Sequence, residues 1–233
     1  MEDRFFNPYK GSEYDKGICG KKVLVLGASF YCPKKDCEFW AECTNPEKKD
    51  SSKFDEICPY YANVEGHLKL SDEPANAISY SIKTYRIFAE LMYEFFTDEE
   101  KEQYKDYDEY VIWNRMAFTD YVQFFLPTTN TYPSYFSERD FDAFIQTLHE
   151  LKPNVIIAWG QPVTAEIRDN PDHKDLFTDL EKLPETESYI CHMKVPGIEH
   201  TITYVNCYHP SSRTYWHKCK ESLSTYLREI FKN

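Results

Sequence analysis

The sequence predicts an α/β protein with three layers, in which helices cover both faces of a central, mainly parallel four-stranded sheet. Residues 23–26 and 155–159 are two apolar runs without polar alternation, which is typical of strands buried on both faces. Segments with helical periodicity separate the apolar runs, so the strands need crossover connections and run parallel. With 233 residues and 42% hydrophobic content, the chain is predicted to form a single domain, 1–233.

The elements of the first half follow from periodicity and from turn residues. Residues 1–20 are predicted to be an irregular strap that holds aromatic side chains against the body. After the strand at 23–26 comes a Cys-rich insertion at about 32–61, too long for an ordinary strand-to-helix connection. Apolar residues three or four apart predict a helix over 74–96, and a second strand is expected at 116–119, ending at Asp120.

The second half continues the alternation of helix and strand. Ser137, followed three residues later by Asp140, resembles a capping box that opens a helix, and Lys152-Pro153 ends it. The strand at 155–160 precedes a short helix at 162–168 and a polar segment through 187. An edge strand is predicted at 189–195, a further strand at 201–208, and a last helix at 214–231.

Composition restricts the class of protein. The amino terminus lacks the basic and apolar regions of a secretory signal, and no stretch reaches the length of a membrane span, so a cytoplasmic protein without membrane partners is expected. The net charge of −12 argues against indiscriminate nucleic-acid binding but leaves room for a local basic groove. The acidic run at 98–109 is interpreted as a solvated helix face.

Polar residues follow each of the four main predicted strands. Because the carboxyl ends of parallel strands meet at one edge of a sheet, where ligands of such sheets bind, these residues are predicted to line a common pocket. They are Ser29 and Tyr31, Asp120 and Gln123, Trp159 and Gln161, and His209 with Ser211 and Ser212.

Three of these motifs resemble the uracil-DNA glycosylase superfamily. Gly27-Ala28-Ser29-Phe30-Tyr31 is similar to its first motif, residues 155–160 to its penultimate strand, and His209-Pro210-Ser211-Ser212 to its His-Pro-Ser motif. Residues 7–11 and 118–123 add a resemblance to an uncharacterised bacterial branch of the superfamily. The likeness covers roughly residues 21–220 in the expected order.

The resemblance implies a DNA-repair hydrolase that flips a base out of the duplex and hydrolyses its N-glycosidic bond. His209 would stabilise the departing base, while Ser29 and Asp120 would position water or substrate. Tyr31 would exclude larger bases by shape, and Phe30 would stack on the base. The wider set implied to contact substrate is Gly27, Phe30, Tyr31, Gln123, Ser211, Ser212, Arg213 and Tyr215.

Other interpretations of the same residues remain open. Asp120 stands where the superfamily commonly has an Asn, and an ionised Asp offers only acceptors, so the identity of the base is not carried over. Ser29 could instead bond the amides of the next turn, Asp120 could cap a helix, and His209 could be a hydrogen-bonded structural residue. A nucleic-acid or nucleotide sensor without catalysis, or an enzyme for an unrelated small molecule, would use the same fold.

Two further segments suggest binding partners. Arg213, Lys218 and Tyr215 combine positive charge with a ring at the start of the last helix, as a DNA-binding edge requires, although a basic helix start explains them too. A cysteine cluster gives a second signal, with spacings that allow structural zinc, an iron–sulfur cluster or plain reduced thiols, of which zinc is favoured. Its members are Cys32, Cys37, Cys43 and Cys58.

Overall fold

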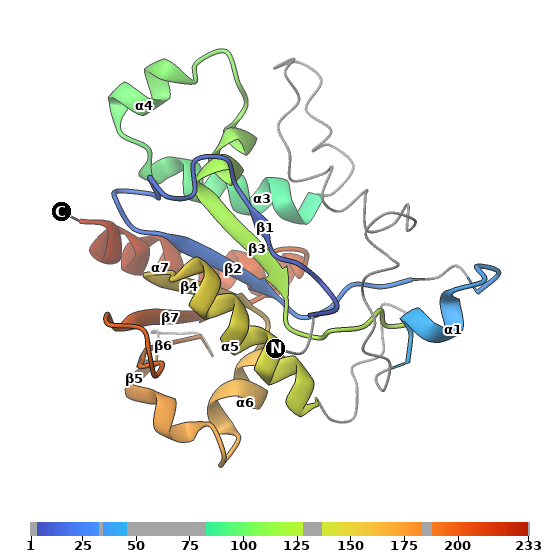
Figure 1. Cartoon of the computed structure of the whole chain (residues 1–233). Coiled ribbons are helices and arrows are strands. Elements are labelled where there is room, and N and C mark those ends of the chain that lie inside the picture. Colours follow the sequence, from blue (N-terminus) through green and yellow to red (C-terminus); the bar gives the residue numbers. More distant parts are fainter. Residues whose placement is uncertain (1–3, 33–34, 46–82, 128–136, 183–187, 233) are drawn as a thin grey trace.

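The computed structural model describes residues 4–32, 35–45, 83–127, 137–182 and 188–232 (Figure 1). They form a seven-stranded mixed sheet in the order β1-β3-β2-β4-β7-β6-β5. Four consecutive strands are parallel, as predicted: β2 (Val23–Gly27), β3 (Met116–Asp120), β4 (Val155–Trp159) and β7 (Ile202–Cys207). The other three strands are antiparallel to their neighbours, so the sheet is wider and more mixed than the predicted four-stranded one: β1 (Tyr9–Lys10), β5 (Phe177–Lys182) and β6 (Tyr189–Met193).

Helices cover both faces of this sheet (Figure 1). One face packs against α3 (Lys83–Met92) and α7 (Arg213–Phe231), which contribute Phe88 and Leu223 to the core. The other face packs against α5 (Glu138–Leu151) and α6 (Gln161–Asp169), which contribute Phe144 and Ile167. The three-layer prediction is therefore confirmed. The predicted helix over 74–96 is observed from Lys83 and continues into a 3₁₀ turn at Tyr93–Phe95, while its first residues lie outside the described part.

One edge of the sheet differs from the prediction. The strand β6 lies between β7 and β5, so it is an interior strand, and the edge strand is β5 in the segment predicted to be merely polar. The pairing of β5 is interrupted between Thr178 and Glu181, and Asp179 has a positive φ of 55°. A bulged edge strand with exposed side chains carries no regular apolar alternation, which is why the sequence pattern missed it.

The amino-terminal segment is tied to the body, as the predicted strap requires. Phe5 and Phe6 are buried and contact Phe125 edge-to-face, with ring centroids 6.2 and 5.0 Å away. The segment also contributes β1, which pairs with β3. The short helix α1 (Trp40–Cys43) lies at the periphery of the molecule (Figure 1).

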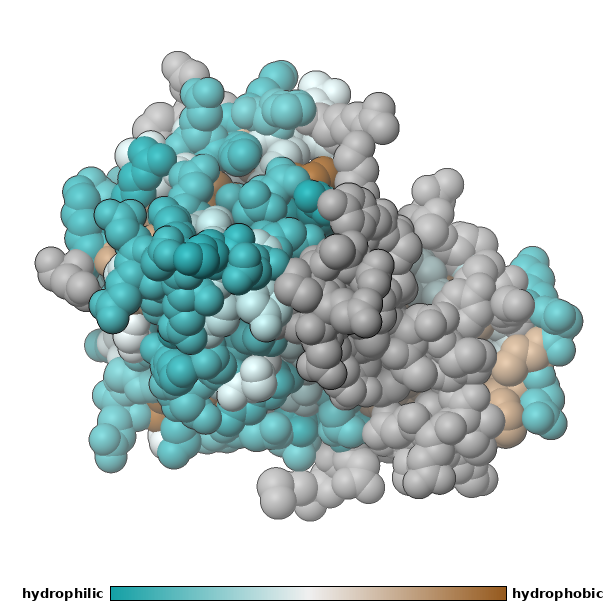
Figure 2. Space-filling model, turned by 90° about the horizontal axis from the view of Figure 1, so that it is seen from above, coloured by the Kyte–Doolittle hydropathy of each residue, from teal (hydrophilic) through white to brown (hydrophobic). Residues whose placement is uncertain are grey.

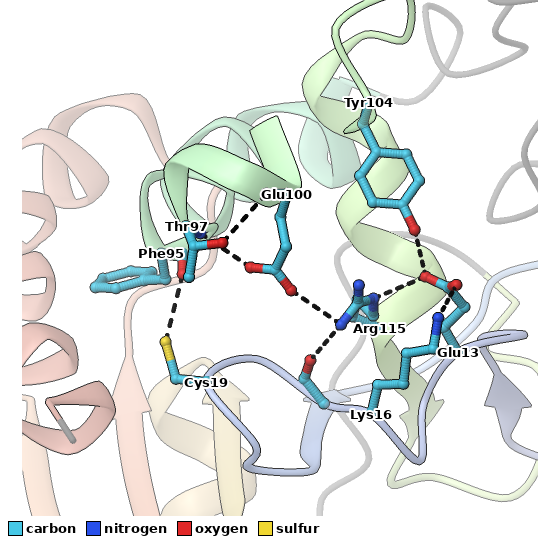
Figure 3. A network of polar contacts seen from close by, with 9 residues as sticks. Glu13, Lys16, Cys19, Phe95, Thr97, Glu100, Tyr104 and Arg115 are labelled. Carbon is cyan, nitrogen blue, oxygen red and sulfur yellow. Dashed lines mark hydrogen bonds and ion pairs between the residues drawn. The ribbon is translucent and has the colours of Figure 1, made fainter. Parts of the chain in front are cut away.

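A buried arginine joins this segment to the acidic surface helix (Figure 3). The guanidinium of Arg115 donates from Nε to Glu13 Oε2 at 2.7 Å and lies 3.1 Å from Glu100 Oε1. Burial acts to raise the pKa of Glu13, but hydrogen bonds from Lys16, Tyr104 and Arg115 outweigh it and lower that pKa to about 2. Arg115 directly precedes β3, so this network fixes the amino end of the strand, away from the site described below.

The acidic run lies at the surface, as predicted, but only its first part is an α-helix, and a 3₁₀ helix begins at Glu109. The helix α4 (Asp98–Gln103) has no buried residue and starts with a capping box between Thr97 and Glu100. The described part of the face in Figure 2 is predominantly hydrophilic. None of the helices within the described ranges is long and apolar enough to cross a membrane.

Candidate functional site

One row of residues crosses the carboxyl ends of the four parallel strands. Gly27 on β2 is paired with Asp120 on β3. On the other side of β2, Leu26 pairs with Ala158, so the next residue along β4, Trp159, is level with Gly27. Trp159 in turn pairs with Cys207 on β7. The predicted meeting of the four strand ends at one edge is therefore confirmed at the level of the backbone.

The row faces the α3 and α7 side of the sheet. Side chains alternate along strands, and the residues two positions earlier on these strands, Val25, Phe118 and Ile157, all belong to the core on that side. Trp159 and Cys207 belong to the same core. Asp120 is thus the polar member of an otherwise apolar face, at its last position before the edge of the sheet.

Asp120 is buried without a hydrogen-bond partner for its carboxyl group within the described part of the chain. The residue is 4% exposed, and burial raises the pKa of its carboxyl from 3.8 to about 8. A Cβ added to Gly27 would lie 1.9 Å from Asp120 Oδ1, so the carboxyl occupies space that any other residue at position 27 would fill. No helix follows Asp120 directly, so the helix-cap alternative is wrong.

Aromatic side chains connect Asp120 to the end of β7. The charge of Asp120 acts on the buried hydroxyl of Tyr85 on α3, whose pKa is raised mainly by burial and further by that carboxylate. The ring of Tyr85 lies 5.8 Å from that of Trp159, and the ring of Trp159 makes an edge contact with His209 at 5.6 Å. Asp120 and His209 therefore border one aromatic cluster.

Local hydrogen bonds orient the ring of His209. The backbone N–H of Ser211 donates to His209 Nδ1 at 3.3 Å, and Ser211 Oγ lies 2.7 Å from the same nitrogen. Because Nδ1 accepts, the proton of the neutral ring is on Nε2, which is left as a donor. Burial lowers the pKa of His209, so the ring is neutral near pH 7. The histidine is thus hydrogen-bonded within its turn and also keeps one nitrogen able to donate to a ligand.

Two more polar atoms at this edge have no partner among the described residues. Ser29 is 9% exposed and its Oγ makes no hydrogen bond, so the alternative in which it bonds the amides of the next turn is wrong. The indole N–H of Trp159 is also buried without an acceptor. Buried donors and acceptors are nearly always satisfied in folded proteins, so these two atoms are available to a polar ligand at this edge.

The other predicted substrate contacts at this edge divide between the two faces. Phe30 packs near Phe118, with ring centroids 6.3 Å apart, on the face of Asp120. Tyr31 packs against the core on the opposite face. The side chain of Gln123 is engaged internally: its Oε1 accepts from the N–H of Phe6 at 3.0 Å and its Nε2 donates to the carbonyl of Asp120 at 3.1 Å. Gln123 is therefore held in a structural role that the sequence did not indicate.

The residues after β7 form the rim beside His209. Ser212 is the cap residue of α7, without a side-chain capping bond, and Ser211 is exposed. Tyr215 is 51% exposed and stacks on Tyr208, with centroids 5.0 Å apart and planes at 25°. Lys218 Nζ lies 5.9 Å from the Tyr215 ring. Arg213 is the first residue of α7, so its backbone belongs to this rim.

The predicted metal ligands lie next to the amino-terminal strap. Cys32 and Cys43 are buried in one apolar cluster with Phe5 and Phe6, while Cys37 is exposed. Cys58 lies outside the described residues, and the described residues alone form no group of metal ligands. A shared position for two of the four thiols agrees with zinc, an iron–sulfur cluster or plain thiols, so zinc stays a prediction, which metal analysis with an absorption spectrum checks.

Comparison with protein-family models and with curated proteins gives no match for this chain. The family resemblance therefore rests on the sequence motifs quoted above. Tyr85 is the site residue that sequence reasoning missed. Its helical spacing marked it only as a core residue, and nothing local to α3 indicates that the charge of Asp120, on a distant strand, acts on its hydroxyl.

Proposed function

We propose that the protein binds a nucleobase at the carboxyl edge of its parallel strands and hydrolyses the N-glycosidic bond of that base, as a DNA glycosylase of the uracil-DNA glycosylase type. The observation that carries the proposal is the row at the strand ends, where the buried carboxyl of Asp120, the unpartnered indole N–H of Trp159 and the ring of His209 lie at one edge of the sheet beside aromatic side chains. Flat rings with a few aimed donors and acceptors are what recognition of a base requires.

The chemistry assigned to the site is hydrolysis at the anomeric carbon of a nucleotide. The bond between C1′ and the base nitrogen breaks, and its electron pair leaves with the base. Water adds its oxygen to C1′ and supplies the proton that the base finally takes up. His209 contributes by donating from Nε2 to the base, where negative charge develops, and a neutral imidazole is suited to that task.

Ser29 and the rim have supporting roles in this proposal. The unpartnered Oγ of Ser29 is able to hold the attacking water, since it needs both a donor and an acceptor. Tyr215 and Lys218 offer an exposed ring and a positive charge beside the site, which suits contact with unpaired nucleotides and phosphate. The net charge of −12 then restricts DNA contact to this local surface.

A binding protein without catalysis is the second candidate, and one observation favours it. Neither Ser29 nor Asp120, whose pKa of about 8 keeps it mostly neutral at pH 7, supplies the carboxylate that would activate water or balance a cationic sugar. Such a protein would recognise the base and release it unchanged.

Base release from oligonucleotides separates the two candidates. Duplex and single-stranded oligonucleotides with a series of deaminated or methylated bases are incubated with wild-type protein, His209→Ala and His217→Ala, and free base is quantified. His217 is an exposed residue of the same helix and serves as the matched control. Release that is lost only in His209→Ala supports the glycosylase. Binding without release supports the binding protein, and the absence of both refutes the proposal.

A further inference from the structure

The feature that the proposed function leaves unexplained is the chemical state of Asp120. An ionised carboxylate buried without hydrogen bonds is among the most unfavourable groups in a protein interior. Asp120 nevertheless lies in the apolar face of the sheet, and within the described part of the chain it has neither a cation nor a donor to compensate its charge. Protonation of the Asp120 carboxyl would remove this charge, so the neutral acid is the more stable form at this place.

The groups that the structure brings to this end of the sheet agree with a neutral acid at position 120. From β2, Gly27 contributes only its backbone, because Asp120 Oδ1 occupies the place of a side chain. Burial, and beyond it the charge of Asp120, raises the pKa of Tyr85 on α3 well above 10, so this phenol is uncharged and adds no positive charge. Trp159 follows from β4 and His209 from the turn after β7, and burial lowers the pKa of His209, so both rings are neutral near pH 7.

We propose that Asp120 recognises its ligand as a neutral carboxylic acid, whose O–H donor and C=O acceptor pair with an adjacent acceptor and N–H donor on the edge of a nucleobase. This inference rests on the proposed function, since it names what that site binds. A protonated carboxyl offers one donor and one acceptor side by side, as a carboxamide does, whereas a carboxylate offers acceptors only. Asp120 would thus offer the same donor and acceptor as the carboxamide of an Asn. Unlike an Asn, it would lose its donor at alkaline pH, where the carboxyl ionises.

The ligand class follows from this pairing. It consists of bases in which a ring N–H adjoins a carbonyl, such as uracil or hypoxanthine, because these match a donor and an acceptor at the same time. Burial raises the pKa of Asp120 to about 8. At pH 7 about nine-tenths of the sites would therefore be protonated, and at pH 9 about one-tenth, which predicts about tenfold weaker binding at pH 9.

Binding is tested with fluorescent single-stranded oligonucleotides that carry one uracil or one hypoxanthine, and with matched probes methylated on the ring nitrogen. Wild-type protein is expected to bind an unmethylated probe at least about tenfold more tightly than its methylated counterpart at pH 7, and to lose about tenfold between pH 7 and pH 9. Asp120→Asn is expected to keep the preference and to bind without the roughly tenfold loss between pH 7 and pH 9. Any loss that it still shows reports titration of the probe itself. Asp120→Ala loses the preference.

The protonation state is measured separately by infrared difference spectroscopy of wild-type protein against Asp120→Asn. A carboxylic C=O band that is present at pH 7 and lost at pH 9 is expected. Absence of the band at pH 7 overturns the inference while leaving the proposed function intact, and so does equal binding by wild type and Asp120→Ala. If no protein binds any probe at pH 7, the proposed function fails together with the inference, whatever the spectrum shows.

Discussion

The pH dependence of stability offers a test of the Asp120 environment that needs no ligand. In the unfolded chain this carboxyl titrates near 3.8, and in the folded protein near 8. Between these values the folded state binds one proton more than the unfolded state, so this group makes the protein less stable as pH rises. The loss begins above pH 3.8 and is complete above about pH 8.

Replacing Asp120 by Asn removes this titration and keeps the shape of the side chain. Each pH unit between the two pKa values corresponds to about 1.4 kcal/mol, so from pH 5 to pH 7 the advantage of Asp120→Asn over wild type should grow by about 2 to 3 kcal/mol. Comparing variant with wild type at each pH cancels the titration of the other carboxylates. The measurement is urea unfolding followed by circular dichroism at both pH values.

Asp140→Asn is the matched control for this experiment. Asp140 is also an Asp with 0% exposure, but its carboxylate accepts from the N–H groups of Ser137 and Gln123 at 2.9 and 2.8 Å. Asp140→Asn should therefore destabilise the protein at pH 7, by about 1 to 3 kcal/mol, because charge-assisted bonds are lost. If Asp120→Asn behaves like Asp140→Asn, or if its advantage is the same at pH 5 and pH 7, the reasoning about the buried acid is refuted.

Three further predictions concern the carboxyl edge of the sheet, the opposite end of the sheet and the rim. Gly27→Ala should lower stability by about 1 to 3 kcal/mol in urea unfolding, since the new methyl group collides with the Asp120 carboxyl. Glu13→Gln should lower the free energy of unfolding by about 1 to 2 kcal/mol at pH 6, after allowance for solvent screening, and by little near pH 2. The stabilisation by a carboxylate with a lowered pKa is complete above its unfolded value of 4.5 and disappears as the pH falls toward its folded value of about 2. Tyr215→Ala should weaken binding of single-stranded DNA by about fivefold to a hundredfold in fluorescence titration, with unchanged stability.

Each of these has a result that would contradict it. A Gly27→Ala protein as stable as wild type would mean that the carboxyl does not occupy the place of the missing side chain. A stability loss in Glu13→Gln that is equal at pH 6 and near pH 2 would contradict the ion-pair explanation. Tyr107, the other large hydrophobic side chain exposed among the described residues, is the control for the rim, and equal effects of Tyr107→Ala and Tyr215→Ala would remove its special role.

Local patterns determined much of this protein. The apolar runs at 23–26 and 155–159 predicted buried parallel strands because only a strand covered on both faces dispenses with polar alternation. Ser137 and Asp140 predicted the start of α5, since a helix end satisfies its first N–H groups with nearby side chains. The rule that parallel strands end at one edge predicted that Asp120, Trp159 and His209 lie in one region.

Tertiary structure alone decided the state and the partners of those side chains. Nothing in residues 118–123 shows that Asp120 is buried, because its burial depends on Gly27 of another strand, which leaves room for the carboxyl. Gln123 looks equally suited to bind a ligand, yet its side-chain oxygen accepts a hydrogen bond from the backbone N–H of Phe6 in the strap. Secondary structure follows from neighbours in the sequence, whereas solvation and hydrogen bonding depend on which distant segments the fold brings together.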